Sequence, residues 1–237
     1  MRQVEFQQAY ILHSRPYRET SLLLEFFTRE HGRMGAVAKG VRSPKSRARG
    51  LLQPFVPLLV TCVGRGELLT LKEFDSAGAM PWLKGRRLVS AFYLNEILMR
   101  LLHRWDPNSD LFCEYRNALF ALVECSQEQE VLRLFEKSLL KAMGYELQLD
   151  KEVETGFKIQ AESVYTFDPE RGPFLVKSEY SEKDPQQSKH LFKGKSLLAL
   201  SEGKLDEASV LWDAKRLMRQ ALAPHLGHKP LESRRLL

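Results

Sequence analysis

The chain has 237 residues, 43% of them hydrophobic, which is enough for one large domain or two small ones with a real core. Its formal net charge is +6, and the excess is N-terminal, since residues 1–87 hold 15 Lys and Arg against 7 Asp and Glu while the other 150 residues hold 21 against 23. Three cysteines without a C-x-x-C pair exclude a disulfide framework and a thiolate zinc site, and the absence of a long apolar run excludes a membrane span.

From Val4 to about Ser76, short apolar runs alternate with turn residues, a pattern typical of β-strands. Five such strands predict a small closed barrel, because closure removes the exposed strand edges. Pro54 and Pro57 cannot donate to a strand ladder, so we expect a bend or a strand edge near Phe55. The expected strands are 4–13, 20–28, 33–39, 53–63 and 67–76.

After residue 80 the apolar period changes to about 3.6, which predicts amphipathic helices. Ser126 with Gln129 indicates a capping box, Gly144 a helix C-terminus and Asp206 another N-cap. Between about 147 and 188 the pattern is irregular, apart from a hairpin expected in VYTFDPERGPFLVK. The final PHLGHKPLESRRLL predicts a polar tail with little to anchor it. The expected helices are 84–104, 109–125, 126–144, 189–202 and 206–223.

The fold class is therefore α+β, with a five-stranded barrel over residues 1–80 and a mainly helical domain over 81–237. The strongest functional signal lies in the barrel, where residues 29–50 carry seven Lys and Arg against Glu30 alone. The second half of this segment is rich in Gly, Ser and Pro, which predicts a mobile loop whose cations follow an irregular phosphate backbone. The residues expected to bind DNA are Arg15, Tyr17, Arg18, Arg33, Lys39, Arg42, Lys45, Arg47 and Arg49.

A basic loop is often no more than solvated surface, but here aromatic residues surround it, and rings that stack on bases are the second part of a single-strand site. Strand aromatics are more often buried than exposed, so we expect at least half of these to lie in the core. Tyr17 is the best candidate for an exposed ring. The six aromatic residues are Tyr10, Tyr17, Phe26, Phe27, Phe55 and Phe74.

Enzyme motifs are missing from the sequence. It has no G-x-x-x-x-G-K-[ST] phosphate loop and no G-x-S-x-G elbow, and only His225 and His228 have a spacing that metal ligands use. We therefore expect no catalytic residue, no metal and no cofactor. A metal-dependent nuclease that uses these two histidines is a rival hypothesis, and it predicts cleavage that depends on magnesium or zinc.

A second candidate surface lies on the helix QEQEVLRLFEKSLLKAMG. Its cations recur every four residues beside apolar side chains, an arrangement that suits an acidic peptide with a hydrophobic end. A core helix with a solvated basic edge explains the same pattern. The residues expected to bind the peptide are Leu132, Arg133, Phe135, Lys137 and Lys141.

Four segments together resemble the RecO family of bacterial recombination mediators. They are LHSRPYRETSLLLEFFTREHGRMGAVAKGVR with the following LLQPFVPLL, then YLNEILMRLL, then FEKSLLKAMGYELQLD, and last AKRLMRQALAPHLGHKPLESRRLL. The most specific parts are T-x-x-x-G-R followed by A-K-G-x-R, and the tail H-L-G-x-K-x-L-x-S-R. The resemblance runs over nearly the whole chain.

The resemblance implies an N-terminal OB-fold, a helical C-terminal domain and no catalytic centre. It implies a cytoplasmic, nucleoid-associated protein that binds single-stranded and duplex DNA, anneals complementary strands, and helps load RecA onto DNA coated by the single-strand binding protein (SSB). The implied partners are the acidic C-terminal tail of SSB, RecR and, indirectly, the RecA filament. Many relatives carry a four-cysteine zinc ribbon where this chain reads YELQLDKEVETGFKI, so we expect a zinc-free insertion at 147–188. An RNA-binding or ribosome-associated OB-fold protein is the alternative, because charge and rings do not distinguish ribose from deoxyribose.

Overall fold

The computed structural model describes residues 2–43, 46–124, 127–176 and 190–236. The chain forms two compact units, and the C-terminal segment belongs to the first of them. Unit 1 comprises residues 1–125 and 230–237, and unit 2 comprises residues 126–229. The sequence places a domain boundary near residue 80, where strands give way to helices. The compact units are defined by contacts instead, so they do not test that boundary, and it stays a prediction.

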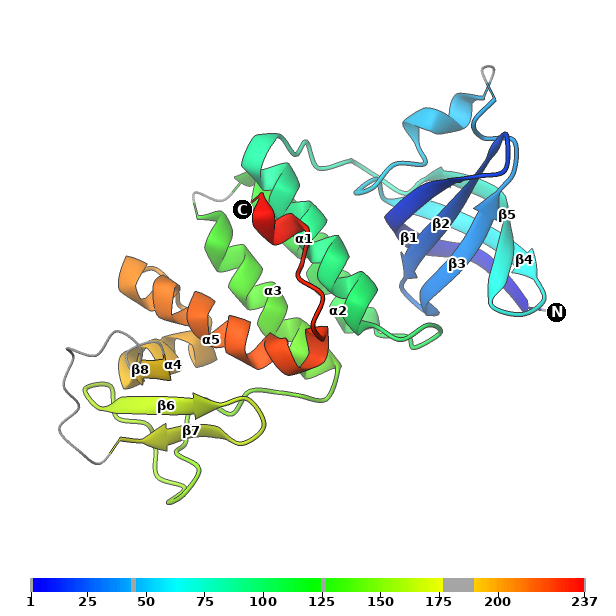
Figure 1. Ribbon diagram of the computed structural model, residues 1–237. Helices are drawn as coiled ribbons and strands as arrows, with labels where there is room; N and C mark the ends of the chain where they lie inside the picture. Colours follow the sequence, from blue (N-terminus) through cyan, green and yellow to red (C-terminus); the bar gives the residue numbers. More distant parts are fainter. Residues whose placement is uncertain (1, 44–45, 125–126, 177–189, 237) are drawn as a thin grey trace. The chain divides into compact units, whose positions relative to one another are not determined.

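Unit 1 begins with a closed five-stranded barrel in the order β1-β2-β3-β5-β4, which is the OB-fold topology (Figure 1). β3 and β5 pair in parallel, and the other pairs are antiparallel. This confirms the expected fold class and all five strands. The strands are β1 (Arg2–Tyr17), β2 (Ser21–Thr28), β3 (Gly32–Ala38), β4 (Leu58–Gly64) and β5 (Leu68–Ser76).

β4 begins five residues later than the sequence predicts, and the prolines explain the difference. Residues 51–57 form turns, and Phe55 has a φ of +69°, so the chain bends there as expected. The barrel core is made by side chains that point inward from the strands and from the β3–β4 connection, among them Ile11, Leu24, Phe26, Met34, Val60 and Leu69.

β2 reads SLLLEFFT, an almost continuous apolar run, because both of its faces are buried. Leu24 and Phe26 point into the barrel, whereas Phe27 points outward against a helix. The outer face carries Tyr10 and Phe27, whose rings lie 5.2–6.0 Å between centroids from those of Phe112 and Tyr115. These four aromatic side chains fix the helical part of unit 1 to the barrel.

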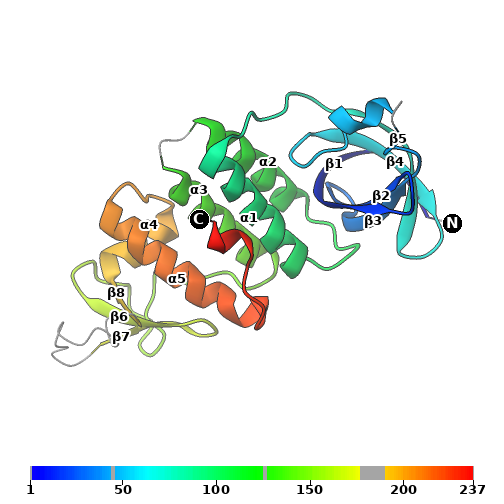
Figure 2. The same ribbon diagram turned by 45° about the horizontal axis from the view of Figure 1, so that its top comes forward.

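The helices of unit 1 are α1 (Gly85–Leu101) and α2 (Ser109–Glu124), which lie side by side (Figures 1 and 2). The amide of Asn95 in α1 connects three elements. Its Nδ2 donates to the Leu12 carbonyl at 2.9 Å, and its Oδ1 accepts from the Tyr115 hydroxyl at 2.5 Å. Asn95 and Tyr115 are both buried, so each of these polar groups depends on the others for a partner.

The motif T-x-x-x-G-R has a structural role at the β2–β3 turn. The Thr28 hydroxyl donates to the Gly32 carbonyl and accepts from the His31 N–H. Gly32 has a φ of +64°, and a Cβ there would lie 2.0 Å from the carbonyl oxygen of Asp106. The chain after α1 therefore passes directly against this turn, and only glycine permits the approach.

Arg33 completes this junction. Its guanidinium donates to the Met99 carbonyl near the end of α1, and its own carbonyl accepts from the Trp105 N–H at 2.9 Å. Burial lowers the pKa of Arg33, with the Glu25 carboxylate opposing that effect and Arg104 adding to it. Arg33 is thus half-buried and hydrogen-bonded inside unit 1, and the DNA contact expected for it stays a prediction.

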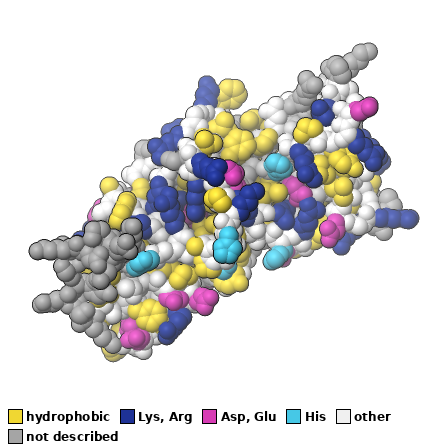
Figure 3. All heavy atoms as spheres, in the orientation of Figure 1, with side chains coloured by type: hydrophobic (Ala, Val, Ile, Leu, Met, Phe, Trp, Pro, Cys, Tyr) yellow, Lys and Arg dark blue, Asp and Glu magenta, His cyan; other side chains and the backbone are white. Residues whose placement is uncertain are grey.

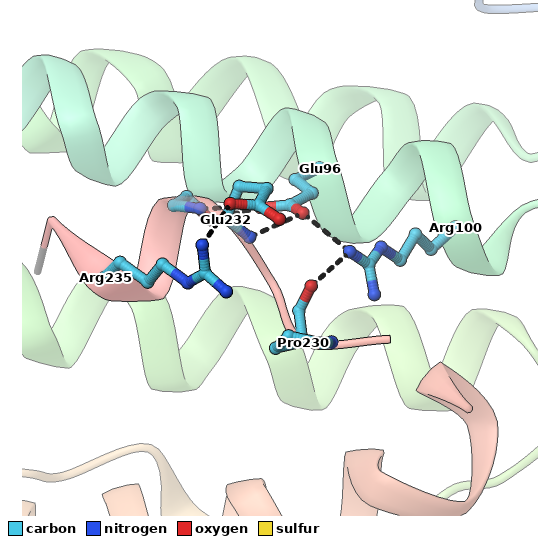
Figure 4. A network of polar contacts seen from close by, with 6 residues as sticks. Glu96, Arg100, Pro230, Glu232 and Arg235 are labelled. Carbon is cyan, nitrogen blue, oxygen red and sulfur yellow. Dashed lines mark hydrogen bonds and ion pairs between the residues drawn. The ribbon is translucent and has the colours of Figure 1, made fainter. Parts of the chain in front are cut away.

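The polar tail is anchored, contrary to the sequence prediction. The Glu96 carboxylate of α1 accepts from the N–H groups of Glu232 and Ser233, both at 2.9 Å, and from the Ser233 hydroxyl at 2.6 Å. Arg100 pairs with Glu96 and donates to the Pro230 carbonyl (Figure 4). Leu231 is buried, and η3 (Ser233–Arg235) ends the segment. Sequence patterns did not predict this docking of the tail, because its hydrogen bonds go to a carboxylate more than 130 residues earlier in the sequence.

The docked tail should respond to acid. Burial acts to raise the pKa of Glu96, but the hydrogen bonds from Ser233 and Glu232 and the charge of Arg100 outweigh it, so the pKa lies below its ordinary value of 4.5. A lowered pKa stabilises the docked form above pH 4.5, and this contribution is lost as the pH falls through the folded-state pKa. We expect the Glu232 and Ser233 amides to lose hydrogen-exchange protection in that range.

Two variants test the cause of this acid response. Glu96→Gln should reduce the protection of these amides already at neutral pH and remove its acid dependence. Glu232→Gln is the matched control, because the Glu232 side chain pairs only with the exposed Arg235 among the described contacts. Equal pH profiles for the parent and Glu96→Gln would contradict the assignment.

In its described residues, unit 2 contains three α-helices and a small antiparallel sheet of order β7-β6-β8. Gly144 lies just beyond α3 with a φ of +85°, as the sequence predicts. The N-cap prediction for Asp206 is wrong, because Glu207 holds the N-cap position of α5. Ser126 of the predicted capping box lies outside the described residues, and Gln127 precedes the first residue of α3. The elements are α3 (Glu128–Ala142), β6 (Val164–Asp168), β7 (Gly172–Leu175), β8 (Leu191–Lys193), α4 (Gly194–Glu202) and α5 (Ala208–Leu226).

The hairpin expected in VYTFDPERGPFLVK is present as β6 and β7. The helix expected at 189–202 begins only at Gly194, because residues 191–193 pair with β6 as a third strand. Much of the region 147–188 otherwise consists of turns, and residues 177–189 lie outside the described part of the chain.

Candidate nucleic-acid interface

Four of the predicted DNA-binding cations meet at one end of the barrel. Arg15 pairs with Leu23, and Leu23 pairs with Val37, so the C-terminal ends of β1 and β3 lie at the same end of the barrel. Arg18 lies in the β1–β2 turn, and Lys39 directly follows β3. Arg42 joins them, because its N–H donates to the Thr20 carbonyl at 2.8 Å and its guanidinium donates to the Arg18 carbonyl at 3.2 Å. We name Arg15, Arg18, Lys39 and Arg42 the cationic end.

The cationic end is accessible. Arg15, Arg18 and Lys39 are exposed, and within the described part of the chain they form no ion pair. Glu19 is the one carboxylate in the β1–β2 turn itself. Four cations against one anion can neutralise the phosphates of a nucleic-acid strand.

Tyr17 belongs to the same end of the barrel. Its ring is half-exposed, with the Arg18 guanidinium 5.3 Å from the ring centroid. Arg33 lies at the opposite end of β3, six residues from Lys39 or about 20 Å along a strand. The structure therefore separates Arg33 from the other predicted residues.

The described part of the basic loop contains a short helical segment. Residues Arg47–Gly50 form a short 3-10 helix, capped where the Ser46 hydroxyl accepts from the Ala48 N–H at 3.2 Å. Ala48 and Leu52 are buried in the barrel core and hold this part of the loop in place. Lys45 lies outside the described residues, as do the side chains of Arg47 and Arg49.

Most barrel aromatics are core residues. Tyr10, Phe26, Phe27 and Phe55 are buried, which confirms that at least half of the six would be, and Tyr17 and Phe74 are half-buried. Sequence reasoning missed two rings that are each 71% exposed, Phe6 and Trp82. Trp82 could have been found from its setting, since PWLKGRR places it beside three cations.

Figure 3 shows Lys and Arg side chains over much of the face drawn, with Asp and Glu among them. The distribution of charged side chains on this face therefore does not by itself locate an interface. The cationic end is instead defined by strand register, by hydrogen bonds and by the exposure of Arg15, Arg18 and Lys39.

The predicted peptide surface on α3 is largely occupied by internal contacts. Leu132 and Phe135 are buried, and the Arg133 guanidinium pairs with Glu136 at 2.7 Å, both side chains being at most 5% exposed. The Lys137 ammonium donates to the carbonyls of Leu200 and Ser201. Lys141 is exposed and pairs with Glu146 at 2.9 Å. The peptide site stays a prediction; of its five residues Lys141 is exposed, Lys137 is half-buried and the other three are buried.

The two histidines of the nuclease hypothesis have separate environments in unit 2. The His225 ring packs on Tyr145 with 4.1 Å between centroids, and His228 is exposed. Among the described residues, no three His, Cys, Asp or Glu side chains are arranged to hold a metal ion. No described helix is long and apolar enough to cross a membrane.

A five-stranded OB-fold barrel with helices packed on it is the class of protein that this structure defines. Two family descriptions match the chain: Recombination protein O N terminal over residues 1–80, and Recombination protein O C terminal over residues 83–235. The chain belongs to the RecO family of DNA repair proteins, which are recombination mediators and not enzymes.

Individual relatives cover nearly the whole chain. The DNA repair protein RecO of Nitrosococcus oceani is 49% identical over 234 residues, which is 99% of this chain and 93% of the relative. The same protein of Methylococcus capsulatus is 45% identical, covering 98% of this chain and 93% of the relative. That of Coxiella burnetii strain RSA 331 is 44% identical over 237 residues, covering 100% and 99%.

Proposed function

We propose that this protein binds single-stranded DNA at the cationic end of its barrel, anneals complementary strands, and helps load RecA onto SSB-coated DNA. The observation that carries the proposal is the meeting of Arg15, Arg18, Lys39 and Arg42 at one exposed end of an OB-fold barrel. OB-folds bind strands with loops and barrel faces of this kind. Membership of a family of DNA repair proteins supports DNA over RNA as the polymer.

Annealing follows from charge neutralisation without ATP. Cations bound to phosphates lower the repulsion between two strands and leave the base edges free to pair. Duplex DNA has the same phosphates, so the protein binds it as well. The protein would act in the cytoplasm at the nucleoid, where RecR and the acidic C-terminal tail of SSB are the proposed partners and the RecA filament is an indirect one.

A salt titration of oligonucleotide binding tests the proposal. If four to six cations of the barrel contact phosphates, the slope of log affinity against log salt should be about −3 to −4 for a single strand. DNA should compete better than RNA of the same sequence. A protein that fails to retain oligonucleotides at low salt would contradict the proposal, and a preference for RNA would favour an RNA-binding or ribosome-associated OB-fold protein.

A further inference from the structure

The segment between the barrel and α1 exposes a large aromatic side chain. Trp82 is 71% exposed and Met80 is 43% exposed, although burying a tryptophan normally favours folding. The Lys84 ammonium lies 5.2 Å from the Trp82 ring centroid. An exposed ring with a cation beside it is the combination that stacks on a base and pairs with a phosphate.

Charge around Trp82 favours a polyanion over a protein partner of mixed charge. From Ser76 to Asn95 the sequence contains no Asp or Glu, and it contains Lys84, Arg86 and Arg87. Lys84 and Arg86 are exposed, and Arg87 also donates to the Val123 carbonyl at 2.6 Å. The local charge is therefore entirely positive along 20 residues.

α1 contacts the barrel and its β3–β4 connection at two described points. The C-terminal part of α1 is held at the Arg33 end of β3, through the Met99 carbonyl. Its N-terminal half faces the β3–β4 connection, where the Phe92 ring packs edge-on against Phe55 with 4.9 Å between centroids. Gly85, the first residue of α1, lies about 10 Å further along the helix from Phe92.

We propose that Trp82 and Lys84 form a base-stacking contact for single-stranded DNA, in addition to the phosphate contacts of the cationic end. This inference rests on the proposed function and adds a stacking site outside the barrel. Of the six aromatic residues near the basic segment, the structure leaves only Tyr17 and Phe74 half-exposed, so the barrel itself offers few rings for stacking. Phe6 is flanked by Glu5, which disfavours phosphate.

Binding of oligo-dT to three variants tests this site, with folding checked by circular dichroism. Trp82→Ala should lower the affinity about 5- to 100-fold, the range associated with loss of one stacked base. Trp82→Phe should retain most of the affinity because it keeps a ring. Trp212→Ala is the matched control: Trp212 is 61% exposed in unit 2, also beside a cation, and its loss should change the affinity less than twofold.

Intrinsic fluorescence gives an independent readout, since the chain has three tryptophans. Single-stranded DNA should quench the parent and Trp212→Phe, and the quenching should largely vanish in Trp82→Phe. Parental affinity and quenching in the Trp82 variants would overturn the stacking site. That result would leave the proposed function intact, whereas a parent protein that does not bind oligo-dT at low salt would contradict the proposed function itself.

Discussion

Replacing Arg15, Arg18, Lys39 and Arg42 together with Glu should abolish strand annealing and lower the affinity for single-stranded DNA at low salt at least about 100-fold. The four side chains are the described cations of one barrel end, and each phosphate contact contributes about 0.7 to the salt slope of a single strand. The slope should therefore become shallower by about 2 to 3. Fluorescence anisotropy at several salt concentrations and an annealing assay measure both effects.

A matched charge change elsewhere separates local contact from net charge. Lys151, Lys158, Lys193 and Arg219 are exposed in unit 2, and changing these four to Glu alters the net charge by the same amount. We expect the salt slope of this control to stay within about 0.7 of the parent value. If both quadruple variants lose binding equally, the cationic end is not the site, and if neither does, the barrel does not bind DNA through these residues.

Gly32→Ala should destabilise unit 1 by about 2–5 kcal/mol. The left-handed backbone costs a residue with a side chain about 1–2 kcal/mol, and forcing a methyl group into a filled space costs about 1–3 kcal/mol more. The second cost arises because the Cβ would lie 2.0 Å from the Asp106 carbonyl oxygen. Urea unfolding followed by circular dichroism measures the change.

Gly40→Ala is the control for this prediction. Gly40 has a φ of +72°, but a Cβ there meets nothing within 4 Å, so only the backbone cost of about 1–2 kcal/mol applies. Equal losses of stability in the two variants would show that the Asp106 contact is not what requires glycine at position 32.

Local sequence patterns predicted the elements well because each strand and helix is specified by its own periodicity. The five strands, the helices of both units and the hairpin at 164–175 all follow from alternation, turn residues and apolar stripes. The predictions are wrong where a contact with a residue distant in the sequence determines the local structure. β8 forms because residues 191–193 pair with β6, and the tail is held by Glu96, and neither partner is visible from local sequence.

Contacts inside the protein also engage some of the cations that were expected to bind a partner. Arg33 contributes to the positive charge of the basic segment, yet its guanidinium donates a hydrogen bond to the Met99 carbonyl. On α3, the periodic cations looked like a rim, but Arg133 is neutralised by Glu136 inside the protein. Composition gives the number of charges in a segment, and only the packing decides which of them face solvent.

Because residues 230–233 are hydrogen-bonded to α1, the N-terminal and C-terminal segments both belong to unit 1, and unit 2 is inserted between them in the sequence. A dye pair attached to the two termini would accordingly read out the integrity of unit 1 and be blind to any movement of residues 126–229. Reporters of such movement need one label inside that stretch, for example at exposed Lys158. An affinity tag added after residue 237 would follow η3 closely, so the docking of the tail should be compared with and without such a tag.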